Sequence, residues 1–333
     1  MRVLDYNAIE DSVYEAMKRK QLPMLTIKYE NKTSEKKGKY LALDLGGTNF
    51  RIAVLNFDMP SHMVIESIVR FKIPEEFKIN GKIFDWMADL IQKEIKDEHQ
   101  GIGFTFSFPL EQTDLSSGKL VQWNKAFDSP EFIGKNVVQV LKERLIDRKI
   151  KQPIISIVND AVGTLLAGRY FYPECQIAVI LGTGTNSALC DDKTIINTEW
   201  GAFNHPSLFA DGLGQDLRDQ NQVFERMVSA KYLPFLYNNQ PHAVAANLAE
   251  DLDAMERAGD AQAKKISERS INLVKAAIRG AMHFLGLEQA TIVIDGSLYE
   301  KYYNYKERLA QSLGSGVKLI EGKDFSLIGS VVN

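Results

Sequence analysis

Residues 41–55 read LALDLGGTNFRIAVL, two apolar runs joined by a Gly-Gly-Thr-Asn turn, with an aspartate before the turn and an arginine after it. The apolar runs predict two buried strands, and glycine permits the tight turn that closes them into a hairpin. Glycine also lets several backbone N–H groups point the same way, and such turns bind anions. The stretch is therefore either a plain hairpin or a phosphate-binding turn.

A second stretch repeats this pattern. Residues 176–190, QIAVILGTGTNSALC, again place a glycine- and threonine-rich turn between apolar runs. Gly46 and Gly182 lie about one domain length apart, which suggests a duplicated unit. Two such turns, each after a buried strand, favour a nucleotide polyphosphate over two structural turns. The chain has no Gly-Lys pair followed by Ser or Thr, so it has no Walker P-loop, and 41–55 lacks the dinucleotide-binding GxGxxG.

The length of 333 residues allows two domains and a sizeable core. Hydrophobic periodicity predicts helices and strands of an α/β protein along the whole chain. The helices are expected at 5–20, 82–97, 132–148, 216–231, 241–257 and 261–285. The strands are expected at 40–45, 51–57, 63–73, 103–108, 153–158 and 291–296. The polar stretch 29–39 is expected to be a solvated linker.

The composition argues against several classes of protein. The net charge of −3 provides no basic field for nucleic acid or an anionic membrane. No apolar run approaches the roughly 18 residues of a transmembrane helix, and the N-terminal stretch lacks the apolar core of a signal peptide. The two cysteines form no CxxC pair, and the five histidines lack metal-ligand spacing, so we expect no zinc site. We expect a cytoplasmic protein without nucleic-acid or membrane partners.

Two aspartates stand where buried strands end. Asp44 ends the first apolar run, and Asp160 follows PIISIVN. Phosphoryl transfer needs a base for the acceptor hydroxyl and Mg²⁺ to neutralise the phosphates. An aspartate after a strand can equally cap the helix that follows, and Asp160 suits that role too. The two readings of Asp160 are compatible.

A third group of polar residues borders the predicted strands. Asn, Glu and Ser side chains suit a neutral polyol, because such a ligand offers many hydroxyl groups and little charge. For any one of these residues, plain surface solvation is the alternative. The group consists of Ser107, Asn124, Lys125, Asn159, Asn186, Glu199 and Glu225.

Taken together, these motifs resemble the hexokinase/glucokinase family of the actin-like sugar kinases, from 39 to 235 and again from 291 to 332. LALDLGGTNFR resembles its first phosphate motif, and GFTFSFPLEQTDLSSGKLVQWNKAF resembles its sugar-binding signature. VNDAVGTLLAG is similar to the first connecting motif, ILGTGTN to the second phosphate motif, and IVIDGSLY to the adenosine motif. The region 236–290 is short for the family and lacks its usual adenine-contacting segment, which leaves the nucleotide preference open.

The resemblance implies roles for individual residues. Asp160 would be the base for the sugar 6-hydroxyl, and Lys125 would ease charge at the transferred phosphoryl group. Asp44 would orient Mg²⁺ through water. The sugar shell would comprise Ser107, Phe108, Asn124, Lys125, Asn159, Asp160, Asn186, Glu199 and Glu225. The ATP side would comprise Asp44, Gly46, Gly47, Thr48, Asn49, Arg51, Gly182, Thr183, Gly184, Lys231, Gly296 and Ser297.

The resemblance further implies a two-lobed, ribonuclease H-like α/β fold, in which each lobe is a mixed sheet flanked by helices. The small lobe would be 38–158, and the large lobe 1–37 and 159–333, with the last residues packing back on the small lobe. The implied activity is transfer of the ATP γ-phosphoryl group to a hexose, most simply glucose, as the lobes close. A non-catalytic sugar sensor, a kinase for another hexose and a homodimer stay open as alternatives.

Overall fold

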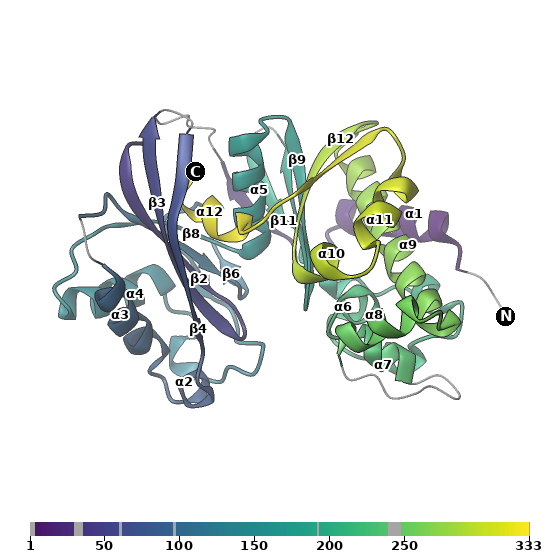
Figure 1. Cartoon of the computed structure of the whole chain (residues 1–333), viewed down its shortest axis with the longest axis horizontal. Helices are drawn as coiled ribbons and strands as arrows, with labels where there is room; N and C mark the ends of the chain where they lie inside the picture. Colours follow the sequence, from purple (N-terminus) through teal and green to yellow (C-terminus); the bar gives the residue numbers. More distant parts are fainter. Residues whose placement is uncertain are drawn as a thin grey trace. The chain divides into compact units, whose positions relative to one another are not determined.

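The structure is a computed structural model that describes residues 4–29, 36–59, 62–95, 98–191, 193–238 and 248–332. Its contacts divide the chain into two compact units. Unit 1 comprises Met1–Met24, Glu174–Asp191 and Ile196–Lys323. Unit 2 comprises Leu25–Pro173, 192–195 and Asp324–Asn333. Each unit is an α/β structure with its own mixed sheet and helices, so the predicted fold class is confirmed (Figure 1).

The sheet of unit 2 has the strand order β4-β3-β2-β5-β8. Strands β2 and β3 pair antiparallel as the predicted hairpin, whereas β2, β5 and β8 run parallel. The strands are β2 (Gly38–Leu45), β3 (Asn49–Met59), β4 (His62–Lys72), β5 (Ile102–Phe106) and β8 (Ile154–Val158). Three shorter strands are β1 (Leu25–Lys28), β6 (Leu110–Glu111) and β7 (Lys119–Leu120). The helices of unit 2 are α2 (Glu75–Ile79), α3 (Ile83–Glu94), α4 (Val137–Asp147), α5 (Asp160–Phe171) and α12 (Phe325–Val332), with a 3₁₀ turn at Pro130–Phe132.

Strand β2 shows why this sheet is buried on both faces. Side chains alternate between the faces of a strand, so the two sides of β2 enter different clusters. Leu41 and Leu43 pack with helices α3 and α4, and Ala42 packs with Leu327 of α12 on the other face. Parallel strands covered by helices on both faces read as continuous apolar runs, and this is the pattern of 41–43, before Asp44.

Helices α5 and α12 cross with their backbones in contact. A Cβ atom on Gly329 would lie 1.7 Å from the Gly163 carbonyl oxygen, so the crossing requires glycine. The buried Thr105 hydroxyl of β5 donates to the Ser326 carbonyl oxygen at 2.7 Å. Helix α12 is thereby fixed against the sheet, on the face that also carries Asp44.

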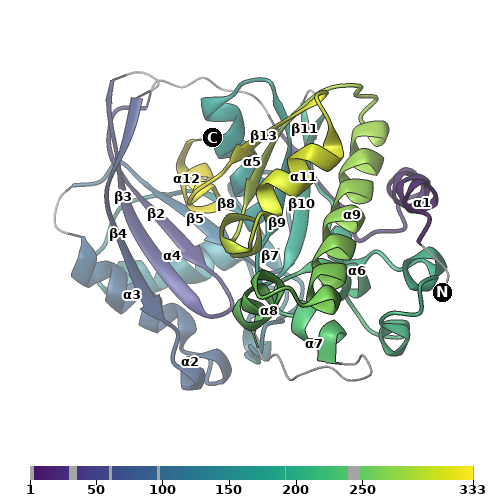
Figure 2. The same cartoon turned by 45° about the vertical axis from the view of Figure 1, so that its right-hand side comes forward.

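The sheet of unit 1 includes the consecutive strands β10-β9-β12-β13. Strands β9 and β10 form the second predicted hairpin, and β12 runs parallel to both β9 and β13. These strands are β9 (Cys175–Leu181), β10 (Thr185–Asp191), β12 (Ala290–Asp295) and β13 (Val317–Glu321); the unit boundary crosses β11 (Thr194–Asn197). Helix α9 packs between α1 and α11 (Figure 2). The helices are α1 (Tyr6–Lys18), α6 (Val223–Val228), α7 (Leu233–Asn238), α8 (Ala249–Arg257), α9 (Ala261–Phe284), α10 (Ser297–Lys301) and α11 (Tyr305–Leu313), with 3₁₀ turns at Trp200–Ala202, Pro206–Phe209 and Gln215–Leu217.

Some element predictions need correction. The predicted helix 216–231 is wrong, because a left-handed residue, Gln222 at φ +57°, interrupts it and leaves only α6. The predicted helix 132–148 begins late, at Val137, where the Asn136 side chain caps it. Residues 96–97 and 241–247 of two predicted helices, and residues 30–35 of the predicted linker, lie outside the described residues.

The contact units also differ from the predicted lobe boundaries. Helix α5 and residues 25–29 fall with unit 2 rather than with the larger unit. For α5 the reason is its close packing against α12, which belongs to the same unit. Within the described part of the chain, no helix combines the length and apolar character needed to cross a bilayer.

Candidate functional site

The side chain of Lys125 packs across the first glycine turn. The turn closes with a hydrogen bond from the Gly46 N–H to the Asn49 carbonyl oxygen at 3.0 Å. A Cβ atom on Gly47 would lie 2.9 Å from the Cβ and Cδ atoms of Lys125, so the stem of Lys125 needs glycine there. The Lys125 ammonium donates to the Ser107 carbonyl oxygen at 2.7 Å. Three predicted site segments therefore meet within unit 2: the phosphate turn, the end of β5 and the 123–127 loop.

Two predicted sugar-binding positions have unusual backbone conformations. Lys125 and the following Ala126 have φ of +56° and +66°, and Glu199 has φ of +49°. Non-glycine residues rarely adopt this left-handed region, and such conformations gather at functional sites, where surrounding structure holds them. Phe108 differs from these positions, because its side chain is 1% exposed and packs against Trp123 and Phe127. Phe108 is therefore part of the aromatic core of unit 2.

Asp44 lies at the centre of a charged cluster on the α12 face of the sheet. Arg51, opposite Asp44 on the paired strand, donates through Nε to the Asp44 carboxylate at 3.0 Å. The same guanidinium donates to Asp324 at 2.6 Å and to the Ser326 hydroxyl at 3.0 Å. The other Asp44 oxygen, Oδ1, is buried and accepts no hydrogen bond in the structure.

This arrangement fits the predicted magnesium role of Asp44. A buried carboxylate oxygen without a partner is costly unless a cation or water meets it, and carboxylate and water are the ligands that Mg²⁺ prefers. Among the described residues no three His, Cys, Asp or Glu side chains gather into a ready-made metal cage. Asp44 alone would then hold the ion, through water, as Mg²⁺ commonly retains several waters.

Asp160 is the first residue of α5, immediately after β8. The helix cap is Asn159 and not Asp160, because the Asn159 side chain accepts the Ala161 N–H at 3.0 Å. The Asp160 Oδ1 atom accepts the same N–H at 2.8 Å, and the residue is half-buried. Asn159 is therefore the helix cap. The second carboxylate oxygen of Asp160, Oδ2, is available to another partner.

In unit 1, hydrogen bonds through Asn197 link two of the predicted sugar-binding residues, Asn186 and Glu199. The Asn186 amide donates to Asn197 at 2.9 Å, and the Asn197 amide donates to Glu199 at 2.8 Å. Glu225 accepts the Thr185 N–H at 3.1 Å. A Cβ atom on Gly184 would lie 2.5 Å from the same carboxylate oxygen, so glycine makes room for Glu225.

The second glycine turn meets the predicted adenosine motif. A Cβ atom on Gly182 would lie 3.3 Å from the Ser297 backbone nitrogen. Gly296, with φ of +135°, approaches Leu181 so closely that a Cβ atom would lie 2.6 Å from its carbonyl. The Ala230 N–H donates to the Gly182 carbonyl oxygen at 2.9 Å, which brings the Ala230–Lys231 segment to the same turn. Thr183 lies exposed at the tip of the turn.

A pocket of about 160 Å³ opens beside this junction. It is lined by Ala230, Ala249, Glu250, Asp253, Ser297, Leu298, Lys301 and Tyr302. Burial raises the pKa of the Tyr302 hydroxyl well above its ordinary value, and the charge of Glu256 raises it further. Burial likewise raises the pKa of the neighbouring Tyr299 to about 12, so both tyrosines are neutral at pH 7.

The structure thus brings some of the predicted site residues into contact within each unit, namely the 46–49 turn with Lys125 in unit 2, and Gly182 with Gly296 and Ser297 in unit 1. Sequence reasoning missed Asn197, which relays between two predicted residues, and Asp324, which shares Arg51 with Asp44. Asn197 lies two positions before Glu199 near the end of β11, so a search of strand ends for side-chain amides would have found it. Asp324 had no comparable signal.

Comparison with known proteins gives one consistent family. Two family models, both described as Hexokinase, match residues 6–170 and 244–330. Hexokinase-1 of rice, Oryza sativa subsp. japonica, is 36% identical over 237 residues, a match that covers 60% of this chain. The match covers 47% of the rice protein, so it spans about half the length of that relative.

Solved structures agree with this result. The glucose complex of hexokinase from Schistosoma mansoni matches with a TM-score of 0.81 and 25% identity, over 98% of this chain and 94% of that one. A ROK family glucokinase from Streptomyces griseus, solved with glucose and AMPPNP, matches with a TM-score of 0.62 and 14% identity. It covers 88% of this chain and 98% of its own, and shows a shared fold.

Proposed function

The chain belongs to the hexokinase family, and we propose that it is a hexose kinase that transfers the γ-phosphoryl group of ATP to the 6-hydroxyl of a hexose. The observation that carries the proposal is the parallel construction of the two glycine turns. Lys125 lies across Gly47 in one unit, and Ser297 lies against Gly182 in the other. Each turn thus follows a buried strand and is closely approached at a glycine, by a side chain at Gly47 and by backbone at Gly182, as suits a phosphate-binding turn.

The residues of unit 2 suit the chemistry of the transfer. Asp160 would accept the proton of the sugar 6-hydroxyl as the oxygen forms its bond to the γ-phosphorus and the bond from that phosphorus to the bridging oxygen of ADP breaks. Lys125 is positioned over the Gly47 turn, where its charge would stabilise the transferred group. Bound Mg²⁺ would supply positive charge that neutralises the phosphates. Asp44, held in place by Arg51, would bind that ion through water.

The polar residues suit recognition of a neutral sugar. In unit 2 the candidates are Ser107, Asn124, Asn159 and Asp160, and in unit 1 they are Asn186, Glu199 and Glu225. The hydrogen bonds from Asn186 to Asn197 and from Asn197 to Glu199 fix side-chain orientation before a ligand arrives. A fixed set of buried donors and acceptors discriminates well between sugars, because a mismatched hydroxyl leaves one of them without a partner. We propose glucose as the hexose, with glycolysis in the cytoplasm as the setting.

A coupled enzyme assay tests the proposal. The purified chain is offered glucose, fructose, mannose or glucosamine, each with ATP, GTP, ADP or pyrophosphate and Mg²⁺. We expect release of ADP that depends on the sugar and on Mg²⁺, with glucose the preferred acceptor. Absence of phosphorylated product with every pairing, although calorimetry detects glucose binding, would replace the kinase with a sugar sensor on the same fold.

A further inference from the structure

The pocket beside Ser297 has an acidic wall. Glu250 and Asp253 line it from α8 and lie three residues apart, which places them on one face of that helix. Helix α10 contributes Ser297 and Lys301, and apolar contact comes from alanine and leucine side chains. Ala230, at one end of the pocket, donates its N–H to Gly182 of the second glycine turn. The pocket therefore lies beside the second glycine turn, the proposed phosphate site.

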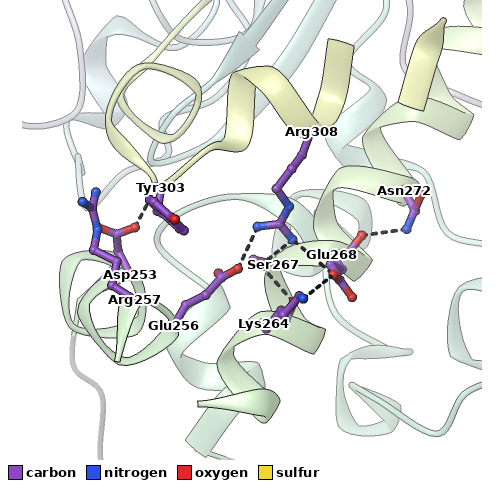
Figure 3. Close-up of polar contacts among 9 residues, drawn as sticks. All are labelled: Asp253, Glu256, Arg257, Lys264, Ser267, Glu268, Asn272, Tyr303 and Arg308. Carbon is purple, nitrogen blue, oxygen red and sulfur yellow. Dashed lines mark hydrogen bonds and ion pairs between the residues drawn. The ribbon is translucent and has the colours of Figure 1, made fainter. Parts of the chain in front are cut away.

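Behind the pocket, a network of charged residues holds α8 against α10 and α11 (Figure 3). Arg308 of α11 donates to Glu256 at 2.8 Å and to the Ser267 hydroxyl at 3.0 Å. The Tyr303 N–H, just after α10, donates to the Asp253 Oδ1 atom at 2.7 Å. The acidic wall therefore has a fixed position relative to Ser297, as a specific binding site needs.

The carboxylates that line the pocket can accept further hydrogen bonds. Glu250 makes no hydrogen bond or ion pair with any described residue. Asp253 accepts from Tyr303 and pairs with Arg257 at 2.9 Å, yet each carboxylate oxygen has two lone pairs and so can accept again. Tyr302 is 6% exposed, and its hydroxyl lies beside Glu256 and Ser267 of the charged network. The open hydrogen-bond acceptors of the pocket itself are therefore the carboxylates of Glu250 and Asp253.

We propose that Glu250 and Asp253 determine nucleotide specificity by accepting hydrogen bonds from the donor groups of the nucleoside. This inference rests on the proposed kinase function. A nucleoside triphosphate carries such donors in two places, the ribose hydroxyls and the exocyclic amino group of the base. An ionised carboxylate only accepts, so it favours a vicinal diol or an amino group and disfavours a ring nitrogen acceptor. Lys301, in the same pocket, offsets the negative charge that would otherwise repel the triphosphate.

Steady-state kinetics of Glu250→Gln, Asp253→Asn and Tyr302→Phe, at saturating hexose, test the proposal. Loss of one charged hydrogen bond corresponds to roughly a 10- to 100-fold change. We expect each carboxylate variant to raise the KM for ATP by about 10-fold or more, with unchanged kcat and hexose KM. Tyr302→Phe removes a hydroxyl that faces Glu256 and Ser267, so its KM for ATP should stay near the wild-type value. An unchanged KM for ATP in both carboxylate variants would overturn the proposal.

Nucleotide analogues identify which donor the carboxylates bind. If it is the ribose, the wild-type chain should prefer ATP to 2′-deoxy-ATP or 3′-deoxy-ATP, and Glu250→Gln should lose that preference. If the carboxylates bind the exocyclic amino group, the wild-type chain should prefer ATP to purine riboside triphosphate, which lacks that group. Glu250→Gln should then lose this preference. Equal use of all these nucleotides by the wild-type chain would contradict both versions.

Matched controls separate binding from structure. Glu300→Gln removes one negative charge from α10 without lining the pocket, and its KM for ATP should stay at the wild-type value. Arg257→Gln removes the partner of Asp253 but leaves the carboxylate, so an increase in the KM for ATP equal to that of Asp253→Asn would indicate a structural role only. If the wild-type chain phosphorylates no sugar, calorimetric titration with ATP still tests the site. ATP binding that Glu250→Gln weakens would support it, and absence of ATP binding would refute it.

Discussion

Arg51 binds the buried carboxylate of Asp44 from the opposite strand of the first hairpin, with Nε at 3.0 Å from Oδ2. The same guanidinium also binds Asp324 at 2.6 Å, and Arg51 and Asp44 are 16% and 9% exposed at their side chains. The single positive charge of Arg51 therefore pairs with two carboxylates, those of Asp44 and Asp324. The cluster keeps a net negative charge. That residual charge is what a cation site needs, because a fully neutralised Asp44 would attract a metal ion less strongly.

Replacing Arg51 by methionine should destabilise the chain by about 2–4 kcal/mol, because two partly buried carboxylates lose their counter-ion. The double variant Arg51→Met/Asp324→Asn should recover about 1–2 kcal/mol of that loss, since one of the repelling charges is gone. Urea unfolding followed by circular dichroism measures both values. Simple additivity of the two single variants would show that Asp324 and Arg51 are not coupled.

Replacing Asp160 by alanine should lower kcat by about two to four orders of magnitude, because the general base is lost. Hexose binding, measured by calorimetry, should change by no more than a few-fold, since the other polar residues of the sugar shell remain. Asp147→Ala, at the exposed end of α4, serves as the control and should keep wild-type kinetics. A kcat within two-fold of wild type for Asp160→Ala would remove this residue from the mechanism.

Replacing Gly184 by alanine should affect sugar binding more than stability. The new Cβ atom would lie 2.5 Å from the Glu225 Oε2 atom, at the flexible end of that side chain. Glu225 can move away at small cost to folding, but its bond to the Thr185 N–H is then lost. We expect about a 10-fold rise in the hexose KM, the lower end of the loss of a charged hydrogen bond, and a nearly unchanged melting temperature. Gly316→Ala, where contacts are ordinary, is the control, and equal hexose KM values for the two variants would contradict this account.

Asp260 should make the long helix α9 sensitive to acid. Its side chain caps the helix through the N–H groups of Gln262 and Ala263, and these bonds, led by that of Ala263, lower the pKa of the carboxyl. A lowered folded-state pKa means that the stabilisation is present above the unfolded pKa, near 4, and is lost as pH falls through the folded value.

Asp260→Ala should therefore cost about 1 kcal/mol at pH 7, the usual value of a helix cap. The difference from wild type should stay constant above about pH 5 and shrink below about pH 4. Urea unfolding at pH 7 and at pH 3.5 measures it, with the exposed Asp11→Ala as the control. A stability difference that grows on acidification would contradict a lowered pKa for Asp260.

Local patterns account for the parts of the fold that the sequence predicts well. Both glycine hairpins follow from apolar runs on either side of a turn, which needs no distant partner. Helix α9 follows from 24 residues of helical periodicity that begin after a capping aspartate. The family motifs then supply the site residues, because each motif is itself a short continuous stretch.

Features that depend on residues far apart in the sequence cannot be predicted from local patterns. Arg51 and Asp324 are 273 positions apart, so no local pattern joins them. The helix predicted at 216–231 fails because the Phe224 N–H donates to the Phe203 carbonyl oxygen and Gln222 adopts a left-handed conformation. Tertiary contacts override local helix propensity there. The acidic wall of the pocket is likewise assembled by helix packing and not by any motif.

The crossing of α5 and α12 has a consequence for how the chain is made. Thr105 of the unit 2 sheet hydrogen-bonds a residue 221 positions later, in the helix that covers this face. At roughly 5–20 residues per second, a ribosome needs about 10–45 s to supply that helix after Thr105 has been joined. During this interval helix α12 does not yet cover the apolar face of the sheet. Hydroxyl groups that are buried in the folded chain, such as that of Thr105, are exposed there. The core of unit 2, which includes Leu327 and Val331 of α12, can therefore be completed only after the last helix has been synthesised.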